Sequence, residues 1–363
     1  MLDRSHFKSL DWWLIFLVLV NSFIGVFMIH SSSHYIPGNY AQKQLFWILV
    51  GLLFLFLFVS VDYNFFVEYS AYIYVVAVLV LGTVLLFGSL TAGTKSWIKL
   101  PFFQIQPSEI TKIVVILLLT YLFKKLRSPF VSMKLSLVSS GLVVIPLVLV
   151  ALQPDLGTAL TYVPILLGAF LLAGMNKKIV VLLIIFGLVL GIFGWNFFLK
   201  DYQKDRIRTL IFPEKDPLGT GYHIIQSKIA IGSGGLFGKG YKKGTQSQLK
   251  FLPARHTDFV FSVIGEEFGF AGVTVVLFLY FLFISRLLQS VYKSRDRAGV
   301  YLVFMVFLMF VSQFLINVLM TVGLFPVAGI PLPFYSYGGS SLLTNYIAVA
   351  LVLNVKMRRF VNV

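Results

Sequence analysis

The sequence predicts an all-α, polytopic integral membrane protein with about ten transmembrane helices. Of its 363 residues, 58% are hydrophobic and only 12% are charged, whereas charged residues make up roughly a quarter of an ordinary soluble domain. The mean hydropathy is +0.89. Apolar runs of roughly 20 residues recur along the chain, and that length crosses a hydrocarbon core of about 30 Å. We expect a single membrane domain covering residues 1–363.

The basic charge of the chain does not indicate nucleic-acid binding. The net charge is +16, but the lysines and arginines are scattered between apolar runs and do not form the continuous basic face that nucleic acid requires. Their distribution predicts membrane topology and contact with anionic lipids instead. The chain has no cysteine, which excludes disulfides and thiolate metal sites.

Ten apolar segments are candidate spans. They are residues 12–29, 45–61, 70–88, 109–123, 137–152, 158–174, 178–199, 270–288, 300–322 and 341–356. The first follows a short polar stretch without a cleavage-site pattern, so we expect a retained span and not a signal peptide. Lysines and arginines of the short connections concentrate on one side, which by the positive-inside rule places both termini in the cytoplasm. The long connection at 200–258, between helices 7 and 8, is then extracytoplasmic.

Polar residues mark the start of the fourth span, in the sequence Gln106-Pro107-Ser108-Glu109 followed by Lys112. Pro107 suits the first position of a helix, and a carboxylate near a helix N-terminus is stabilised by the helix dipole. Glu109 and Lys112 are three residues apart, so they share a helix face and can pair. A capped, ion-paired helix start and a polar site both agree with this pattern.

Asp155 lies in a turn between two predicted spans, Gln153-Pro-Asp-Leu-Gly157. An aspartate in such a turn often only closes the backbone. Glu109, Asp155 and Asp258 are nevertheless all predicted on the outer face of the membrane, and this grouping favours a shared site.

The long loop combines a predicted helix with a basic, glycine-rich segment. Tyr222, Ile225 and Ile229 share one face, which predicts a helix lying in the membrane interface. The run 232–240 lacks the serine or threonine of a Walker loop, so a flexible turn is the better interpretation. Basic side chains in this loop either attract a phosphorylated lipid or are simply solvated. They are Lys239, Lys242, Lys243, Lys250 and Arg255.

The segment 323–341, between the last two spans, is uncharged and rich in proline and glycine. It cannot form a regular helix. Irregular backbone at membrane depth is tolerated only where protein or a water-filled cavity receives it. The segment is therefore either received inside the protein or a rigid outer loop.

The densest polar cluster lies in the segment 251–269, which contains Arg255, His256, Asp258, Glu266 and Glu267. A helix from 259 to 285 is about 40 Å long, which exceeds the hydrocarbon core of about 30 Å. Its first turns should therefore lie at the outer surface, with Glu266 and Glu267 in the interface, where carboxylates are tolerated. Asp258 near the helix start is an N-cap, a general base or a ligand for a hard cation.

Four long motifs carry a family resemblance, in the order Gln106-Pro-Ser-Glu109, Gln153-Pro-Asp-Leu-Gly-Thr158, Arg255-His-Thr-Asp-Phe-Val-Phe261 with Gly265-Glu-Glu-Phe-Gly269, and Pro331-Leu-Pro-Phe-Tyr-Ser-Tyr-Gly-Gly-Ser340. Together they resemble the SEDS family (shape, elongation, division and sporulation), and the resemblance covers nearly the whole chain. The segments 252–256 and 325–331 look more like its elongation branch than its division branch.

The resemblance implies a ten-helix peptidoglycan glycosyltransferase. Such an enzyme joins lipid II disaccharides into glycan strands at the outer face of the bacterial cytoplasmic membrane during elongation and maintenance of rod shape. It works with a class B penicillin-binding protein, a transpeptidase that crosslinks the new strand. The family's dependence on divalent cations implies Mg or Mn as a cofactor.

Functional residues follow from the matching motif positions. Asp258 matches the essential aspartate, Glu109 and Lys112 match the polar pair of the central cavity, and Asp155 matches a further carboxylate. The predicted cavity is completed by Arg255, His256, Lys239, Ser336 and Ser340. Asp258 is also the candidate metal ligand. Ala254 stands where relatives often have glutamate, which leaves one carboxylate fewer for a metal.

We expect Asp258 to deprotonate the acceptor hydroxyl in a single inverting displacement. Lys112, the loop cations or a metal ion would stabilise the leaving diphosphate, and Glu109 would hold Lys112 in place. Two other classes of function remain. A lipid II flippase should carry polar residues to the middle of repeat-related helices, a pattern that does not stand out here. A non-catalytic scaffold of the cell-wall synthesis complex would tolerate loss of Asp258.

Overall fold

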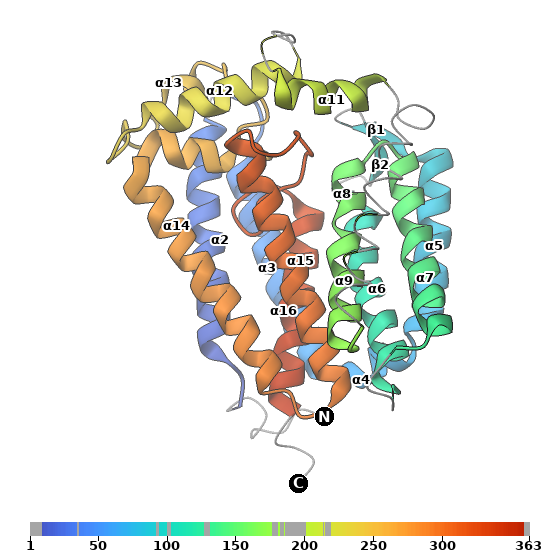
Figure 1. Cartoon of the computed structure of the whole chain (residues 1–363). Helices are drawn as coiled ribbons and strands as arrows, with labels where there is room; N and C mark the ends of the chain where they lie inside the picture. Colours follow the sequence, from blue (N-terminus) through green and yellow to red (C-terminus); the bar gives the residue numbers. More distant parts are fainter. Residues whose placement is uncertain are drawn as a thin grey trace.

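A computed structural model describes residues 9–34, 36–91, 94–99, 103–126, 131–175, 201–212 and 219–358, together with residues 181, 185 and 214. These residues form a bundle of helices whose long members run roughly side by side, with shorter helices across one end (Figure 1). Its long apolar helices are α2 (Trp12–Ser32), α3 (Tyr40–Ser60), α5 (Ser70–Phe87), α7 (Met133–Leu152), α14 (Val260–Tyr292), α15 (Arg297–Thr321) and α16 (Gly339–Arg358).

These seven helices are long and apolar enough to cross a membrane. Helix α6 (Pro107–Lys124) has 18 residues but carries three charged side chains. Helices α8 (Leu156–Leu160) and α9 (Tyr162–Leu172) together make a shorter apolar segment. The predicted span at 178–199 lies outside the described residues, apart from residues 181 and 185. Nine of the ten predicted spans thus coincide with helices in the described part of the chain, and the protein is a multi-pass membrane protein.

Helix α16 forms the centre of the bundle. Every side chain from Ser340 to Met357 is buried, and the helix packs against α3, α6 and α15. Buried amides replace water as partners for backbone groups here: Asn354 donates from Nδ2 to the backbone oxygen of Phe58 at 2.7 Å. Because this helix is enclosed on all sides, its sequence has no separate apolar and polar faces and shows no amphipathic stripe.

The first and last described helices are joined at one end of the bundle by Asp11. This residue caps α2 by accepting a hydrogen bond from Leu14 N at 3.3 Å. Its carboxylate also accepts hydrogen bonds from Arg286 of α14, at 2.8 Å from Nε, and from Lys356 of α16. The start of α2 and the ends of α14 and α16 therefore lie at the same end, opposite the short helices.

Helix α14 is broken at Gly269. This residue has φ 63° and ψ −156°, a backbone conformation that only glycine adopts without strain. A Cβ there would lie 2.4 Å from the backbone nitrogen of Gly238. The part before the break runs across the end of the bundle, and the part after it runs along the bundle (Figure 1). Its first turns thus lie at one end of the bundle, but residues Val260 to Glu267 are buried there by other parts of the protein and do not lie at a surface.

A small antiparallel sheet departs from the all-α expectation. Strands β1 (Ser89–Thr91), β2 (Thr94–Lys99) and β3 (Gln104–Ile105) pair in the order β1-β2-β3. The strands are too short, and too mixed in polarity, for the alternation that reveals strands in a sequence. The sheet lies directly before α6 and leads the chain into its first residue, Pro107.

Three further helices lie within the predicted loop 200–258. They are α11 (Asp201–Ile211), α12 (Thr220–Ser233) and α13 (Thr245–Gln248). Together with the short α4 (Tyr63–Glu68) they complete the helices of the described residues. The helix predicted around Tyr222–Ile229 is confirmed as α12. It packs on α14 and α15, where Ser227 Oγ donates to the backbone oxygen of Thr321 at 2.5 Å.

The second half of the segment 322–338 is received inside the protein, whereas Leu324 in its first half is 70% exposed. Leu332, Phe334 and Tyr335 are at most 1% exposed. Asn317 Nδ2 donates to the backbone oxygen of Ile330 at 2.7 Å, and Gln44 Nε2 donates to that of Ser336 at 3.1 Å. Side chains of the helices thus supply the hydrogen bonds that the irregular backbone needs. This outcome decides between the two alternatives that the composition left open.

Candidate active site

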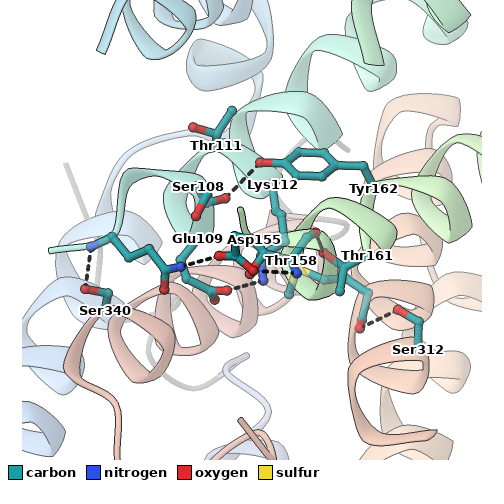
Figure 2. Close-up of polar contacts among 12 residues, drawn as sticks. Ser108, Glu109, Thr111, Lys112, Asp155, Thr158, Thr161, Tyr162, Ser312 and Ser340 are labelled. Carbon is teal, nitrogen blue, oxygen red and sulfur yellow. Dashed lines mark hydrogen bonds and ion pairs between the residues drawn. The ribbon is translucent and has the colours of Figure 1, made fainter. Parts of the chain in front are cut away.

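A buried polar cluster lies where α6, α8 and α16 begin (Figure 2). Gln106 connects the three helices. Its backbone N–H donates to Ser340 Oγ at 2.9 Å, and its side-chain amide donates to Asp155 Oδ2 at 2.7 Å. Tyr162 of α9 adds a third contact by donating from its hydroxyl to the backbone oxygen of Ser108 at 2.8 Å. Residues far apart in the sequence therefore share one site.

Glu109 and Lys112 form the ion pair that their spacing predicts. Lys112 Nζ lies 2.7 Å from Glu109 Oε1, and the side chains are 1% and 4% exposed. The other carboxylate oxygen, Glu109 Oε2, is buried and has no hydrogen-bond partner within the described part of the chain. A buried ion pair with an unsatisfied oxygen is costly for folding. Its presence at a helix start beside two other polar helix starts favours the site interpretation over a simple capped helix.

Asp155 combines the structural role and the site role that the sequence left open. It caps α8, because its Oδ1 accepts a hydrogen bond from Thr158 N at 3.1 Å. It is only 8% exposed. Burial raises the pKa of Asp155, and the negative charge of Glu109 adds to that rise, while Thr158 and the positive charge of Lys112 oppose it. The charges of α6 thus act directly on this carboxyl.

Asp258 lies in the turn just before α14 and is half-buried. Its backbone oxygen accepts a hydrogen bond from Asn317 Nδ2 at 2.9 Å. Burial raises the pKa of Asp258 to about 6, and the charge of Asp155 adds to this rise, while Thr257 and the positive charge of Arg206 on α11 oppose it. A carboxylate with this pKa is ionised near neutral pH yet more basic than an exposed one, which suits a general base.

Two consecutive residues of the segment 322–338 lie close to Gly157 and to Asp258. A Cβ on Gly157, two residues after Asp155, would lie 2.0 Å from the backbone oxygen of Ala328. A Cβ on the next residue, Gly329, would lie 3.7 Å from Asp258 Oδ2. Asp258 and Gly157, two residues after Asp155, therefore both lie close to the Ala328–Gly329 backbone, and the charge of Asp155 acts on Asp258. Glycine at position 157 permits this approach, because any side chain would push the segment away.

Four of the predicted site residues lie elsewhere. Arg255 is buried and donates from Nε to the backbone oxygen of Ser32 at 2.6 Å and from Nη1 to that of Ser247. His256 packs its ring against Tyr40, with ring centroids 4.7 Å apart. These two residues anchor the turn that carries Asp258. Their hydrogen bonds and ring contacts are made to residues outside the cluster of Gln106, Glu109 and Asp155.

Lys239 and Ser336 have structural partners. Lys239 Nζ lies 2.9 Å from Glu266 Oε1. Ser336 is 4% exposed, and its Oγ accepts a hydrogen bond from Leu332 N at 2.8 Å inside its own loop. Ser340, in contrast, belongs to the cluster through Gln106.

Glu266 and Glu267 were expected in the membrane interface, and the structure corrects this. Both are fully buried. Glu266 accepts hydrogen bonds from the backbone of Gln246 at 2.7 Å and of Ser247 at 3.0 Å, in addition to its pair with Lys239. Glu267 accepts from Ser31 Oγ at 2.6 Å. The chain before Asp258 folds over them, so the two carboxylates hold the loop 239–258 and do not face lipid.

The sequence interpretation missed three residues that contribute to the site. Gln106 was noted only as part of a motif, although it connects Asp155 with α16. Asn317 joins the Asp258 turn to the segment 322–338. Its signal was an amide one turn before the end of an apolar helix. Arg206 acts on Asp258 by charge from α11, and nothing in the sequence connects these two distant positions.

The described residues contain no group of three or more histidines, aspartates and glutamates with metal-binding geometry. Asp258 and the unsatisfied oxygen of Glu109 are the carboxylate oxygens of this site that are left for a cation. Mg²⁺ is commonly held by one or two carboxylates together with substrate phosphate oxygens and water. The donor set thus fits a cation shared with a phosphorylated substrate and does not fit one held by protein alone.

The fold and this site define a multi-pass helical membrane protein with buried acids at one end of its bundle. The FtsW/RodA/SpoVE family of cell cycle proteins matches residues 11–360. The chain belongs to this family, which confirms the resemblance drawn from its four motifs.

Relatives of the chain match it over nearly their whole length. Peptidoglycan glycosyltransferase MrdB of Escherichia coli K12 is 35% identical, with 98% of this chain and 95% of the relative covered. Peptidoglycan glycosyltransferase RodA of Treponema pallidum is 33% identical, with 97% and 95% covered.

Solved structures agree with the fold. A chain in a peptidoglycan synthase complex, solved to show how polymerization and crosslinking are coordinated, has a TM-score of 0.82 at 31% identity. The rod shape determining protein RodA of Thermus thermophilus has a TM-score of 0.73 at 27% identity. In both comparisons 97% of this chain and 98% of the other chain are covered.

Proposed function

We propose that the chain is a peptidoglycan glycosyltransferase that joins the disaccharides of lipid II into glycan strands. The observation that carries this proposal is the placement of Asp258, a half-buried carboxyl with a pKa of about 6, beside the Ala328–Gly329 backbone, which also meets Gly157, two residues from Asp155. Full-length relatives that are named peptidoglycan glycosyltransferases support it. The similarity to RodA proteins favours a role in cell elongation and rod shape.

The chemistry is one inverting displacement. Asp258 accepts the proton of the acceptor sugar's 4-hydroxyl as that oxygen attacks the anomeric carbon of a second, lipid-linked glycan. The bond from that carbon to the diphosphate oxygen breaks, and the diphosphate leaves with the electron pair. A single displacement requires no covalent carboxylate nucleophile, unlike a retaining glycosidase. Asp155 and Glu109 are therefore free to serve in positioning and electrostatics.

The structure changes the role proposed for Lys112. Its ammonium is enclosed and bonded to Glu109, so it is not available to contact a diphosphate directly. We assign it to holding Glu109 and lowering the pKa of Asp155 by charge. Arg206, which already acts on Asp258 from α11, is the better candidate for the cation that faces the leaving group.

A divalent cation, Mg or Mn, is proposed as cofactor, held by Asp258 and by substrate oxygens. When bound, such an ion would stabilise the negative charge of the departing diphosphate. Asp258 cannot hold the ion and accept the proton through the same oxygen. We therefore assign one carboxylate oxygen to each role.

We further propose ten transmembrane helices with both termini in the bacterial cytoplasm and the loop 200–258 outside, within one membrane domain. The pairing of Asp11 with Lys356 supports common placement of the two ends of the chain. The active site would then lie at the outer face of the cytoplasmic membrane, where a class B penicillin-binding protein can crosslink the new strand. The similarity to a synthase complex that couples polymerization with crosslinking supports this partner.

Purified protein in detergent, given lipid II with Mg²⁺ or with a chelator, tests the proposal. We expect polymer from the wild type with Mg²⁺ and none from Asp258→Asn. A matched control is Asp205→Asn, because Asp205 on α11 is 54% exposed and its ion pair within the described residues is with neighbouring Arg208. Polymer formation by Asp258→Asn at the wild-type rate would exclude the base assignment. Lipid II translocation without polymer would indicate a flippase, and neither activity, even with the transpeptidase added, would indicate a scaffold.

A further inference from the structure

An apolar groove opens between α2 and α14, at the break in α14. Its volume is about 420 Å³. All ten residues that line it are apolar, among them Phe27 of α2, Phe268 and Val275 of α14, and Phe237 from the preceding loop. Phe237 is 82% exposed and Val275 is 54% exposed, so the groove opens outward on a face that would meet membrane hydrocarbon.

The break at Gly269 lies beside this groove, and α14 lines the groove from both sides of the break. Ile264 and Phe268 precede the break, and Ala271, Gly272, Val275 and Val276 follow it. The exposed side chain of Phe270 stands next to Ala271 in the chain, at 67% exposure.

Basic groups gather at the loop end of the groove. The ring of Tyr241 stacks on Phe27, a groove residue, with centroids 4.1 Å apart, and its hydroxyl lies 2.7 Å from His30 Nδ1. This contact places the next residue, Lys242, beside the end of α2, where its Nζ lies 3.4 Å from His34 Nδ1. Lys243 follows and is exposed.

The acids closest to these cations in the fold do not neutralise them at the surface. Glu266 and Glu267 are fully buried and are occupied by Lys239, Ser31 and backbone N–H groups. Neither Lys242 nor Lys243 forms a salt bridge with any residue that the structure describes. Lys242 also has φ 60°, a left-handed conformation that is strained for lysine. Positive charge is therefore held at the loop end of a wholly apolar groove.

We propose that this groove binds a hydrocarbon chain of an anionic membrane phospholipid, whose phosphate lies against Lys242 and Lys243. The groove combines an apolar lining with a basic end, which matches the two parts of such a lipid, whereas a partner helix would match the apolar lining alone. Basic residues beside an apolar surface attract anionic headgroups. Charge and shape thus select one class of ligand.

This lipid is distinct from the substrate proposed above. The stack of Tyr241 on Phe27 stands at the loop end of the groove. Beyond it, the end of α2 is bonded to Arg255 through the backbone oxygen of Ser32. A tail lying in the groove therefore leads to Lys242 and Lys243, and the buried Arg255 stands between it and Asp258. The lipid would hold the loop 239–258 in place and take no part in the chemistry.

Native mass spectrometry of the full-length protein tests this site. Wild-type protein released from detergent after incubation with phosphatidylglycerol or phosphatidylcholine should retain the anionic lipid preferentially. Each lysine that contacts a headgroup contributes about fivefold in affinity. Lys242→Gln with Lys243→Gln should therefore abolish most of this preference, whereas Lys134→Gln, an exposed lysine at the start of α7, should leave it unchanged.

A groove-filling variant tests the tail. Val275→Trp should lower retention of both lipids, because its indole occupies the groove. Leu277→Trp, at a position on α14 that is 40% exposed and outside the groove, should not. Equal retention of the two lipids by the wild type would refute the headgroup contact. Equal effects of the two tryptophan variants would refute the groove. Neither result would depend on whether the protein polymerises lipid II.

Discussion

The carboxylates of the candidate site differ in their surroundings, and this difference separates their roles. Glu109 is enclosed and bonded to Lys112, whereas Asp258 is half-buried beside the Gly329 backbone. Lys112 holds the Glu109 carboxylate in an enclosed position, while a partly solvated carboxyl with a raised pKa can exchange a proton with substrate and water. The residue that performs the proton transfer is therefore set apart by its environment and not by its residue type.

Polymerisation should depend on pH through Asp258. With a pKa of about 6, the carboxylate is mostly ionised at pH 7 and mostly protonated at pH 5. Initial rates at lipid II concentrations well below KM, which report the free enzyme, should therefore fall about tenfold between these values. The folded state binds this proton more tightly than the unfolded state, so the group's contribution to stability decreases as the pH rises through 6. A flat rate profile from pH 5 to 7 would contradict the base assignment.

The buried pair of α6 should behave as a unit. Lys112→Met leaves the Glu109 carboxylate buried without its cation, which should cost about 3–5 kcal/mol. The double variant Lys112→Met with Glu109→Gln removes both charges and should recover much of this loss. Thermal unfolding in detergent measures both effects. A double variant no more stable than the single variant would show that the pair is not coupled as the geometry indicates.

At the scale of elements, the broken α14 and the loop folded over it carry Asp258 together. Glu266 and Glu267 lie on the segment before the break, and each binds the loop 239–258 that leads to the active turn. The catalytic position is thus fixed by two carboxylates that come after it in the sequence. Such buried acids are anchors, because their oxygens are satisfied by backbone N–H groups and hydroxyls of the loop they hold.

Removing one anchor should loosen the loop. Glu266→Gln loses the ion pair with Lys239 and weakens the hydrogen bonds from Gln246 N and Ser247 N. A hydrogen bond to a charged group contributes about 1.5–3 kcal/mol, so exchange of these two amides should accelerate at least tenfold. The rate of polymerisation should fall as the loop loosens. Glu68→Gln, which removes a 53% exposed partner of Lys124, is the matched control and should change neither. Unchanged amide exchange in Glu266→Gln would mean that the Glu266 carboxylate does not hold the loop 239–258 in place.

The sequence predicted those parts of the fold that depend on local pattern. The spacing of Glu109 and Lys112 predicted their ion pair. The lengths of the apolar runs predicted nine spans that coincide with helices of the described residues. The prediction that Glu266 and Glu267 lie in the membrane interface was wrong, because hydropathy cannot show that a loop folds back over a polar helix face. The closeness of Gly157 and Asp258 to one stretch of backbone depends on Ala328 and Gly329, which neither motif contains. The predicted topology placed Asp155 and Asp258 on one face of the membrane, and the family motifs then brought them into one site prediction.

At the scale of the whole molecule, the two ends of the bundle differ in charge and in structure. One end holds the Asp11–Arg286–Lys356 cluster, with Lys293 and Arg295 close by in the chain. The other carries α11, α12 and α13, lying across the bundle (Figure 1). Cationic loops remain in the cytoplasm, so the end with the polar site should be the outer one.

Single cysteines can test this orientation directly, because the chain contains none. We choose Asp205→Cys on α11 and Lys293→Cys at the end of α14, both at exposed positions. In sealed, right-side-out membrane vesicles, a membrane-impermeant maleimide should label the first at once and the second only after permeabilisation. The cysteine-free protein controls for background. Labelling in the reverse order would place Asp258 in the cytoplasm, where a polymerase of exported glycan could not work, and the proposed function would have to be abandoned together with the topology.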